Sequence, residues 1–511
     1  MKFADELKKT LDEEFNVAVT ENGALSYRTT GKPLLDMNFS VSSTRNENSD
    51  VIEKRFAKAF FANKLLAIKW LFYAGDVRGG MGERRLFRIC LNYLANTEPK
   101  LCERLLPLVA EYTRWDNLLP LLKTPLKESV CALFKEQLKA DILAMEKGKT
   151  VSLLAKWLPS INATSPASKE YAKILIKELS LTQKEYRKTL VVLRKYLNVV
   201  EVAMSEKAWG DIDYEAVPSK ANLLYNAAFL KNDEERRKAF LEKLKKGEVK
   251  INAEVLYPHD IVHRYTSGGW SVQLKEYDET LEQLWKGLPD YVKGEGNTIC
   301  VADGSGSMTI TLNGTTISAL DVANALAIYF AERSSGDFKD KYITFSDNPQ
   351  LVDLSGCKSL HDKLGVALSH DEVATTNIEG VFDLILTTAV KNRIKQEEMP
   401  KNVLILSDME FNYAVDVRDD LDGKKLFQVI QERYEEYGYK LPRVVFWNIC
   451  SRTGAIPLKE NKLGVALVSG FSPTTLDMVM SSKLDPLDCL VEQLSKERYQ
   501  PVEDAVKDLL Q

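Results

Sequence analysis

The sequence has none of the features that mark exported or membrane proteins. No run of about 18 apolar residues occurs among its 511 residues, and no short apolar segment follows Met1. We therefore expect a protein without a membrane partner that is located in the cytoplasm. A chain of this length exceeds what one hydrophobic core supports, so two or more domains are expected.

Cysteine and histidine are scarce and show no strong metal-binding pattern. The seven cysteines are odd in number and scattered, with no C-x-x-C pair, which predicts free thiols in a reducing compartment. Two of the four histidines, His259 and His263, are spaced four residues apart, as zinc ligands on a helix can be. The glutamate of the zincin motif and a third ligand are both missing, so a structural role for these histidines is favoured.

Motifs of common enzymes are missing as well. No serine lies in a G-x-S-x-G elbow, and the glycine-rich segment 76–85 is not followed by the Gly-Lys-Ser/Thr of a nucleotide-binding loop. A metal-dependent nuclease or phosphatase is a weaker alternative that would depend on Asp303, Asp408 and the two histidines. We expect a protein that is not an enzyme.

The net charge of −4 conceals an uneven distribution. Residues 51–200 hold 27 Lys and Arg against 14 Asp and Glu, a balance of +13. Residues 301–511 hold 22 against 32, a balance of −10. A basic block on an otherwise acidic chain indicates a polyanionic partner for that block alone.

The hydrophobic pattern divides the chain into three segments. Residues 1–50 predict a helix and, around Asn22-Gly23, a β-hairpin, which we expect to pack on the helical domain. Residues 51–293 contain successive amphipathic helices with short loops, a pattern typical of bundles or solenoids of paired helices. In residues 294–511 strands alternate with helices, which predicts a parallel sheet covered on both faces. The expected fold class is multidomain, all-α followed by α/β.

Acidic and hydroxyl side chains follow two of the predicted strands. The strand at 298–303 ends in Asp303, with Ser305 and Ser307 in the next loop, and the strand at 402–408 ends in Asp408. Ligands of a doubly wound sheet collect beyond the carboxyl ends of the strands, so these side chains should meet if the strands are neighbours. Carboxylate and hydroxyl oxygens suit a hard divalent cation.

Together with the loop Ala-Thr-Thr-Asn-Ile-Glu-Gly at 374–380, these motifs resemble a von Willebrand factor A (vWA) domain with a metal-ion-dependent adhesion site. The resemblance implies a Rossmann-like doubly wound sheet and a set of ligands for Mg2+ or Mn2+, namely Asp303, Ser305, Ser307, Thr376 and Asp408. It also implies one open coordination position, which water or a carboxylate from a protein partner fills. Such a site is a binding device and not a catalyst.

The order of a helical half and then a vWA domain resembles the Ro (TROVE) ribonucleoproteins. In that family a ring of HEAT-like helices binds Y RNA, a structured noncoding RNA, and can thread misfolded RNA. A second resemblance, to an uncharacterised family of bacterial and phage proteins, spans nearly the whole chain. Its motifs here include Thr-Glu-Asn-Gly-Ala (20–24), Asp-Val-Arg-Gly-Gly-Met-Gly-Glu-Arg-Arg (76–85) and Arg-Trp-Asp (114–116).

Two groups of basic residues in the helical half are candidate RNA contacts. The first group lies in and just after a glycine-rich segment that joins two predicted helices. It contains Arg78, Arg84, Arg85 and Arg88. Its arginines could instead pair with Asp76, Glu83 and the neighbouring helix. The second group lies on one predicted helix and contains Lys184, Arg187, Lys188, Arg194 and Lys195. A solvated helix face is the commoner cause of such a group.

Two functions follow from these features. The leading hypothesis is a Ro-type scaffold that binds structured noncoding or misfolded RNA through its helical half and recruits a protein through Mg2+. The alternative is a protein-assembly adaptor without RNA, working beside a partner such as an AAA+ ATPase. Retained nucleic acid in the purified protein would separate the two.

Overall fold

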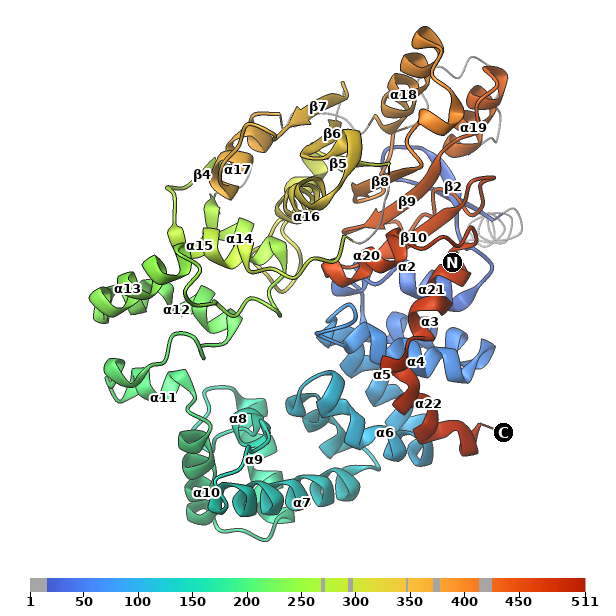
Figure 1. The fold of residues 1–511 in the computed structure, drawn as a ribbon. Coiled ribbons are helices and arrows are strands. Elements are labelled where there is room, and N and C mark those ends of the chain that lie inside the picture. Colours follow the sequence, from blue (N-terminus) through green and yellow to red (C-terminus); the bar gives the residue numbers. More distant parts are fainter. Residues whose placement is uncertain are drawn as a thin grey trace. The chain divides into compact units, whose positions relative to one another are not determined.

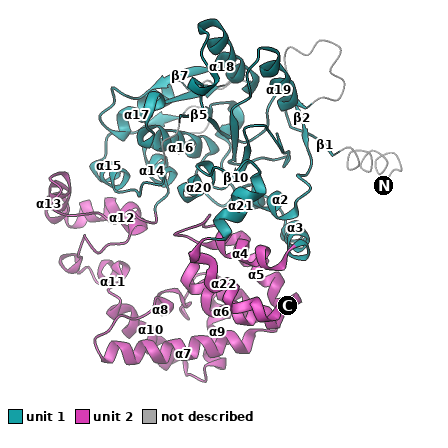
Figure 2. Ribbon diagram, turned by 45° about the vertical axis from the view of Figure 1, so that its right-hand side comes forward, with its two compact units in different colours: residues 1–62, 256–495 teal, residues 63–255, 496–511 magenta. Residues whose placement is uncertain are grey.

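The computed structural model describes residues 16–267, 272–292, 297–345, 348–370, 377–412 and 425–510. The chain forms two compact units, each built from two segments of the sequence (Figure 2). Residues 1–62 and 256–495 form the first, here called the sheet unit. Residues 63–255 and 496–511 form the second, here called the helical unit.

The sheet unit is built on six strands in the order β10-β9-β8-β5-β6-β7 (Figure 1). All neighbours pair in parallel except β6 and β7, which are antiparallel. The chain runs outward from β5 to β6 and, on the other side, from β8 to β10, so the strand order reverses between β5 and β8. The strands are β5 (Thr298–Asp303), β6 (Lys341–Phe345), β7 (Gln350–Asp353), β8 (Asn402–Ser407), β9 (Arg443–Asn448) and β10 (Val465–Ser469).

Helices bury both faces of this sheet. Helices α18 (Ile378–Asn392) and α19 (Leu426–Glu436) share a hydrophobic core with Ile299 and Val301 of β5. The alternating residues of β5, Cys300 and Ala302, are also buried, and α16 (Ala319–Arg333) contacts β5, β6 and β8. A parallel sheet buried on both faces explains why its strands read as continuous apolar runs. The expected α/β fold is confirmed. The other helices of segment 256–495 are α14 (Pro258–Tyr265), α15 (Glu279–Lys286), α17 (Leu360–Ser369), α20 (Leu476–Val479) and α21 (Pro486–Leu494).

The N-terminal segment belongs to the sheet unit. The hairpin expected around Asn22-Gly23 is present as β1 (Val17–Val19) and β2 (Leu25–Tyr27). Backbone hydrogen bonds of 2.8 Å join Tyr27 and Ile456 in both directions. Helix α2 (Pro33–Phe39) places Leu35 and Phe39 in the core of the sheet, and α3 (Ser49–Ala62) packs on α2. Residues 17–62 therefore belong to the sheet unit and not to the helical domain, to which the sequence had led us to assign them, because Leu35 and Phe39 complete the core of the sheet.

The helical unit consists of consecutive helices, as predicted for this part of the chain. Helices that are adjacent in sequence contact one another, as α4 does with α5 and α5 does with α6. The helices are α4 (Lys64–Gly75), α5 (Arg84–Thr97), α6 (Pro99–Tyr112), a 3-10 helix (Trp115–Lys123), α7 (Lys127–Glu146), α8 (Leu154–Trp157), α9 (Pro166–Glu178), α10 (Gln183–Tyr196), α11 (Val200–Ser205), α12 (Ser219–Asn232) and α13 (Glu234–Lys245).

The C-terminal residues return to the helical unit and do not complete the α/β domain. Helix α22 (Gln500–Val506) packs against α4 and α6. Just before it, the Arg498 side chain donates a hydrogen bond of 2.7 Å to the fully buried carboxylate of Asp76, and the Tyr499 hydroxyl donates one of 3.1 Å. The units of the structure thus differ from the expected boundaries at both ends of the 294–511 segment, since the sheet unit begins again at 256 and ends at 495.

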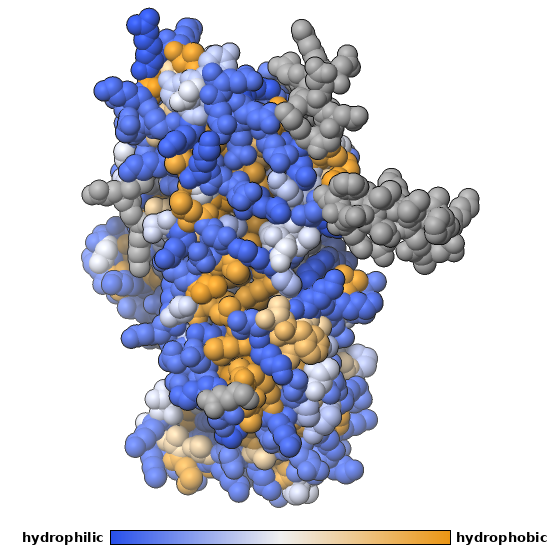
Figure 3. Space-filling view, turned by 90° about the vertical axis from the view of Figure 1, so that its right-hand side faces the viewer, coloured by the Kyte–Doolittle hydropathy of each residue, from blue (hydrophilic) through white to orange (hydrophobic). Residues whose placement is uncertain are grey.

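Within the described ranges, no helix combines the length and the apolar character needed to cross a bilayer. The face drawn in Figure 3 is covered mostly by hydrophilic residues, with hydrophobic residues in patches between them. Patches of this kind are ordinary on folded proteins.

Candidate metal centre and nucleic-acid interface

Two acidic residues meet at the carboxyl ends of adjacent strands. Asp303 is the last residue of β5, and Asp408 directly follows β8, which pairs in parallel with β5. The strand order reverses at this pair, the position where doubly wound sheets bind ligands. Both side chains are buried, with 1% of Asp303 and none of Asp408 exposed.

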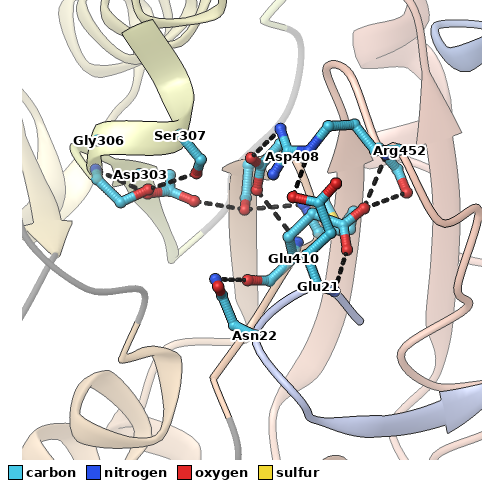
Figure 4. A network of polar contacts seen from close by, with 12 residues as sticks. Glu21, Asn22, Asp303, Gly306, Ser307, Asp408, Glu410 and Arg452 are labelled. Atoms are coloured by element: carbon cyan, nitrogen blue, oxygen red, sulfur yellow. Dashed lines mark hydrogen bonds and ion pairs between the residues drawn. The ribbon is translucent and has the colours of Figure 1, made fainter. Parts of the chain in front are cut away.

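The loop after β5 brings two hydroxyl groups to the same place (Figure 4). The Ser305 backbone N–H donates a hydrogen bond of 2.9 Å to Asp303 Oδ1, and the Ser407 hydroxyl donates one of 2.6 Å to Asp303 Oδ2. The hydroxyl oxygens of Ser305 and Ser307 lie 3.1 Å apart. These contacts fix the Asp303 carboxylate and hold both serine oxygens beside it.

Burial makes the negative charge at this edge unfavourable. It raises the pKa of Asp303 to about 7, with the nearby charge of Asp408 as the second cause. The pKa of Asp408 is also raised by burial, although the Arg452 guanidinium opposes that shift. The negative charge of the two carboxylates is not fully balanced by nearby cations. Together with the two hydroxyls they form a set of oxygen donors that fits a hard divalent cation.

Arg452, which the sequence patterns did not single out, is the cation nearest to Asp408. Its Nη1 lies 3.0 Å from Asp408 Oδ2, and its Nε lies 2.7 Å from Glu21 Oε2 in the N-terminal hairpin. A second hydrogen bond of 3.1 Å runs from the Glu410 backbone N–H to Asp408 Oδ1. Arg452 thus connects the hairpin to the candidate metal centre (Figure 4).

Glu410 is a second residue that the sequence analysis missed. Its fully buried carboxylate accepts hydrogen bonds from the backbone N–H groups of Arg452 at 2.8 Å, Thr453 at 2.9 Å and Glu21 at 2.9 Å. The preceding residue, Met409, has a φ of 63°, a left-handed conformation that is uncommon without glycine. The signal available in the sequence was an acidic residue two positions after Asp408, the aspartate at the end of the predicted strand.

The fifth expected ligand lies outside the described residues. The structure therefore brings together Asp303, Ser305, Ser307 and Asp408 but gives no place to Thr376. Across the described ranges, no cluster of three or more His, Cys, Asp or Glu side chains forms an alternative metal centre.

The two spaced histidines take separate partners. The His263 ring contacts Asp321 Oδ2 at 2.9 Å through Nδ1 and Thr316 Oγ1 at 2.9 Å through Nε2. The His259 ring packs against the Phe471 ring, with 5.7 Å between centroids. Each of the two rings thus has structural contacts of its own.

The first basic group surrounds an aspartate of the neighbouring helical element. Arg84 and Arg88 both form ion pairs with Asp116, the latter at 3.1 Å, and Arg114 joins them at 2.9 Å. Arg85 is exposed, and the Arg78 side chain lies within 3.5 Å of the Glu111 carbonyl oxygen. Pairing with a neighbouring element was the alternative interpretation of this group, and it applies to Arg84 and Arg88.

The second basic group is divided by its helix. Helix α10 exposes four of the five residues, namely Lys184, Arg187, Lys188 and Lys195. Arg194 lies on the other side, where its guanidinium donates hydrogen bonds of 2.8 Å to the Ala155 carbonyl and 2.7 Å to the Leu158 carbonyl. Arg194, which the sequence offered as an RNA contact together with the other four residues, therefore has these donors occupied at α8.

Three comparisons relate the chain to known proteins. One family model, described as a domain of unknown function (DUF7788), matches residues 297–507, and another (DUF2828) matches residues 20–111 and 162–298. The "Uncharacterized protein L728" of Acanthamoeba polyphaga mimivirus is 30% identical over 528 aligned positions, which cover 95% of this chain and 89% of that protein. The chain belongs to the family of this mimivirus protein.

A solved structure, the Ro (RSR) protein of Deinococcus radiodurans, is also similar to the chain. The match covers 84% of this chain and 93% of the Ro chain, at 13% sequence identity and a TM-score of 0.43.

Proposed function

We propose that this family member is a cytoplasmic, non-catalytic scaffold that recruits a protein partner through Mg2+ or Mn2+ at the edge of the sheet. Asp303, Ser305, Ser307 and Asp408 would hold the ion, together with Thr376 as the vWA resemblance implies. The observation that carries this proposal is the charge of Asp303. Its carboxylate is buried, and none of the cationic side chains in the described ranges forms an ion pair with it. A buried carboxylate without a counterion is costly, and a bound cation removes that cost.

The surrounding residues prepare the donors for such an ion. Ser407 and the Ser305 N–H hold the Asp303 carboxylate, while Arg452 and the Glu410 N–H hold that of Asp408. When bound, a hard divalent cation supplies an open coordination position for a carboxylate of the partner. No general acid or base is needed for that role.

Thermal unfolding tests the metal proposal. Mg2+ in the millimolar range should raise the melting temperature of the wild type by mass action and should not raise that of Asp303→Ala. Equal responses of both proteins, or no response of the wild type to either Mg2+ or EDTA, would count against the proposal.

For the helical unit we propose binding of structured noncoding or misfolded RNA. The observations that favour this role are the exposed basic side chains of α10 and the group of three arginines that share Asp116. The balance of +13 over residues 51–200 supports the same partner, because phosphate neutralisation dominates nucleic-acid affinity.

A binding titration separates this proposal from the protein-adaptor alternative. Binding of a structured RNA hairpin should weaken as salt rises and should weaken further in the variant Lys188→Ala/Lys195→Ala. The control Lys243→Ala/Lys246→Ala removes the same charge from the end of α13. Affinity no tighter than for heparin, with no loss in the α10 variant, would favour an adaptor that works with a protein such as an AAA+ ATPase.

A further inference from the structure

We propose that Arg84, Arg88 and Arg114 form a single binding site for a phosphate group, supplied by the backbone of a bound RNA. This inference rests on the RNA-binding role proposed above and assigns part of it to particular atoms. It adds Arg114, Asp116 and Trp157 to the residues that the sequence had indicated.

The three guanidinium groups converge on one carboxylate. Nη2 of Arg84, Arg88 and Arg114 all pair with Oδ2 of Asp116, the latter two at 3.1 and 2.9 Å. Among the described residues, no second carboxylate pairs with any of the three arginines. Three positive charges against one negative charge leave a surplus of two.

This surplus lies in a partly buried place. The side chain of Asp116 is only 11% exposed, and those of Arg88 and Arg114 are each 29% exposed. Burial lowers the pKa of Arg84 to about 10; Asp116 opposes the shift, and repulsion by Arg88 and Arg114 adds to it. Cations that are partly withdrawn from water and repel one another favour an additional anion.

The arginines are also held in position before any ligand arrives. Arg88 Nε donates a hydrogen bond of 2.7 Å to Asn117 Oδ1, and its Nη2 donates one of 3.0 Å to the Asp116 carbonyl. The guanidinium carbon of Arg114 lies 3.9 Å from the centre of the Trp157 ring, a cation–π contact. Arg84 is the most exposed of the three, at 44%, and its Nε donates a hydrogen bond of 3.4 Å to Asn117 Oδ1. Guanidinium groups fixed in this way suit the geometry of a phosphate and lose little freedom on binding it.

A nucleic-acid backbone is the source that the surroundings favour. The site lies within the block of residues 51–200, whose balance of +13 would attract a chain of phosphates more strongly than a single one. A phosphate carried by a protein or a small molecule would use the same three arginines, so the experiment includes a probe for the phosphate alone.

The test compares Arg84→Gln/Arg88→Gln with a control that loses the same charge elsewhere on the helical unit, Arg104→Gln/Lys139→Gln. Both control positions are exposed. Filter binding of an RNA hairpin at several salt concentrations gives the slope of log K against log salt. We expect the slope to fall by about one in the first variant, because both arginines contact the same phosphate, and we expect weaker binding. The control should keep the slope of the wild type.

A second measurement follows the phosphate alone. Orthophosphate should produce a saturable change in tryptophan fluorescence that is lost in Trp157→Phe and in Arg84→Gln/Arg88→Gln. If the wild type binds RNA and the arginine variant behaves like the control, this site is wrong and RNA binding itself stands. If the wild type binds no RNA, the proposed RNA function fails, and the response to orthophosphate then decides whether the three arginines form a phosphate site. A saturable response would keep the phosphate site with another source of phosphate, and no response would overturn it.

Discussion

At the scale of single residues, Glu410 joins three parts of the sheet unit. Its carboxylate accepts N–H groups from the hairpin at Glu21 and from the loop at Arg452 and Thr453, while its own N–H donates to Asp408. A buried carboxylate is stable only while donors hydrogen-bond to its oxygens, and these donors in turn need the carboxylate as their acceptor. Glu410 therefore supports the candidate metal centre through hydrogen bonds within the protein, and we assign it no role as a metal ligand.

Substitution of Glu410 by glutamine should destabilise the sheet unit. The amide replaces one acceptor oxygen by a donor that faces backbone N–H groups, which costs about 2–3 kcal/mol of unfolding free energy. Thermal melting should show a clear decrease for Glu410→Gln and almost none for Glu436→Gln, an exposed glutamate at the end of α19. Equal melting of the two variants would contradict the role given to Glu410.

The Asp303 carboxyl should make stability depend on pH when divalent cations are removed. Its pKa is raised from 3.8 to about 7 by burial and by Asp408, so the folded state holds the proton more tightly than the unfolded state. Its stabilising contribution is therefore complete below pH 3.8 and is lost as the pH rises to about 7. In EDTA, melting temperatures between pH 4 and 8 should fall for the wild type relative to Asp303→Asn. A constant difference between the two proteins would contradict this assignment.

At the scale of elements, the sequence predicted most helices and strands because their signals are local. The capping box of α10 is formed by Thr182 and Glu185, and Asn22-Gly23 marks the hairpin turn. Where an element docks depends on partners far away in the sequence. Tyr27 pairs with Ile456, and Arg498 reaches Asp76, and no periodicity in the chain records either contact. The donors of Arg194, a candidate RNA contact, are likewise occupied by carbonyl groups at α8, which the sequence pattern does not record.

The C-terminal helix α22 should depend on the ion pair between Arg498 and Asp76. Asp76 is fully buried, so loss of its cation leaves an uncompensated charge, at a cost of about 3–5 kcal/mol. Arg498→Gln should lower the melting temperature of the helical unit markedly. Arg104→Gln, which removes an exposed pair with Asp508, should cost less than about 1 kcal/mol of unfolding free energy and barely change the melting temperature. Similar losses in both variants would contradict the importance of the buried pair.

At the scale of the whole molecule, each unit is discontinuous in sequence. The sequence analysis placed one boundary near 294, where the pattern changes from helices to alternating strands. The structure returns the N-terminal residues to the sheet unit and the C-terminal residues to the helical unit. A change in the hydrophobic pattern marks where helices give way to alternating strands and helices. It does not show which hydrophobic core the flanking segments complete.

Fragments of the chain test this organisation. Residues 297–511 alone lack Leu35 and Phe39, which belong to the core of the sheet, so this fragment should be poorly soluble or bind hydrophobic dyes. A protein that joins residues 16–62 to residues 256–495 through a flexible linker should give a cooperative melt and a mixed α/β circular dichroism spectrum. Stable folding of 297–511 without the N-terminal segment would contradict the division into units.

The central claim is that Asp303 and its neighbours bind one divalent cation. Electron paramagnetic resonance measures this directly with Mn2+, because bound Mn2+ loses the signal of the free ion. We predict one Mn2+ per chain for the wild type and for Glu436→Gln, displacement by excess Mg2+, and no bound ion for Asp303→Ala. Wild-type protein that leaves all Mn2+ free, or Asp303→Ala that binds as much Mn2+ as the wild type, would contradict the account.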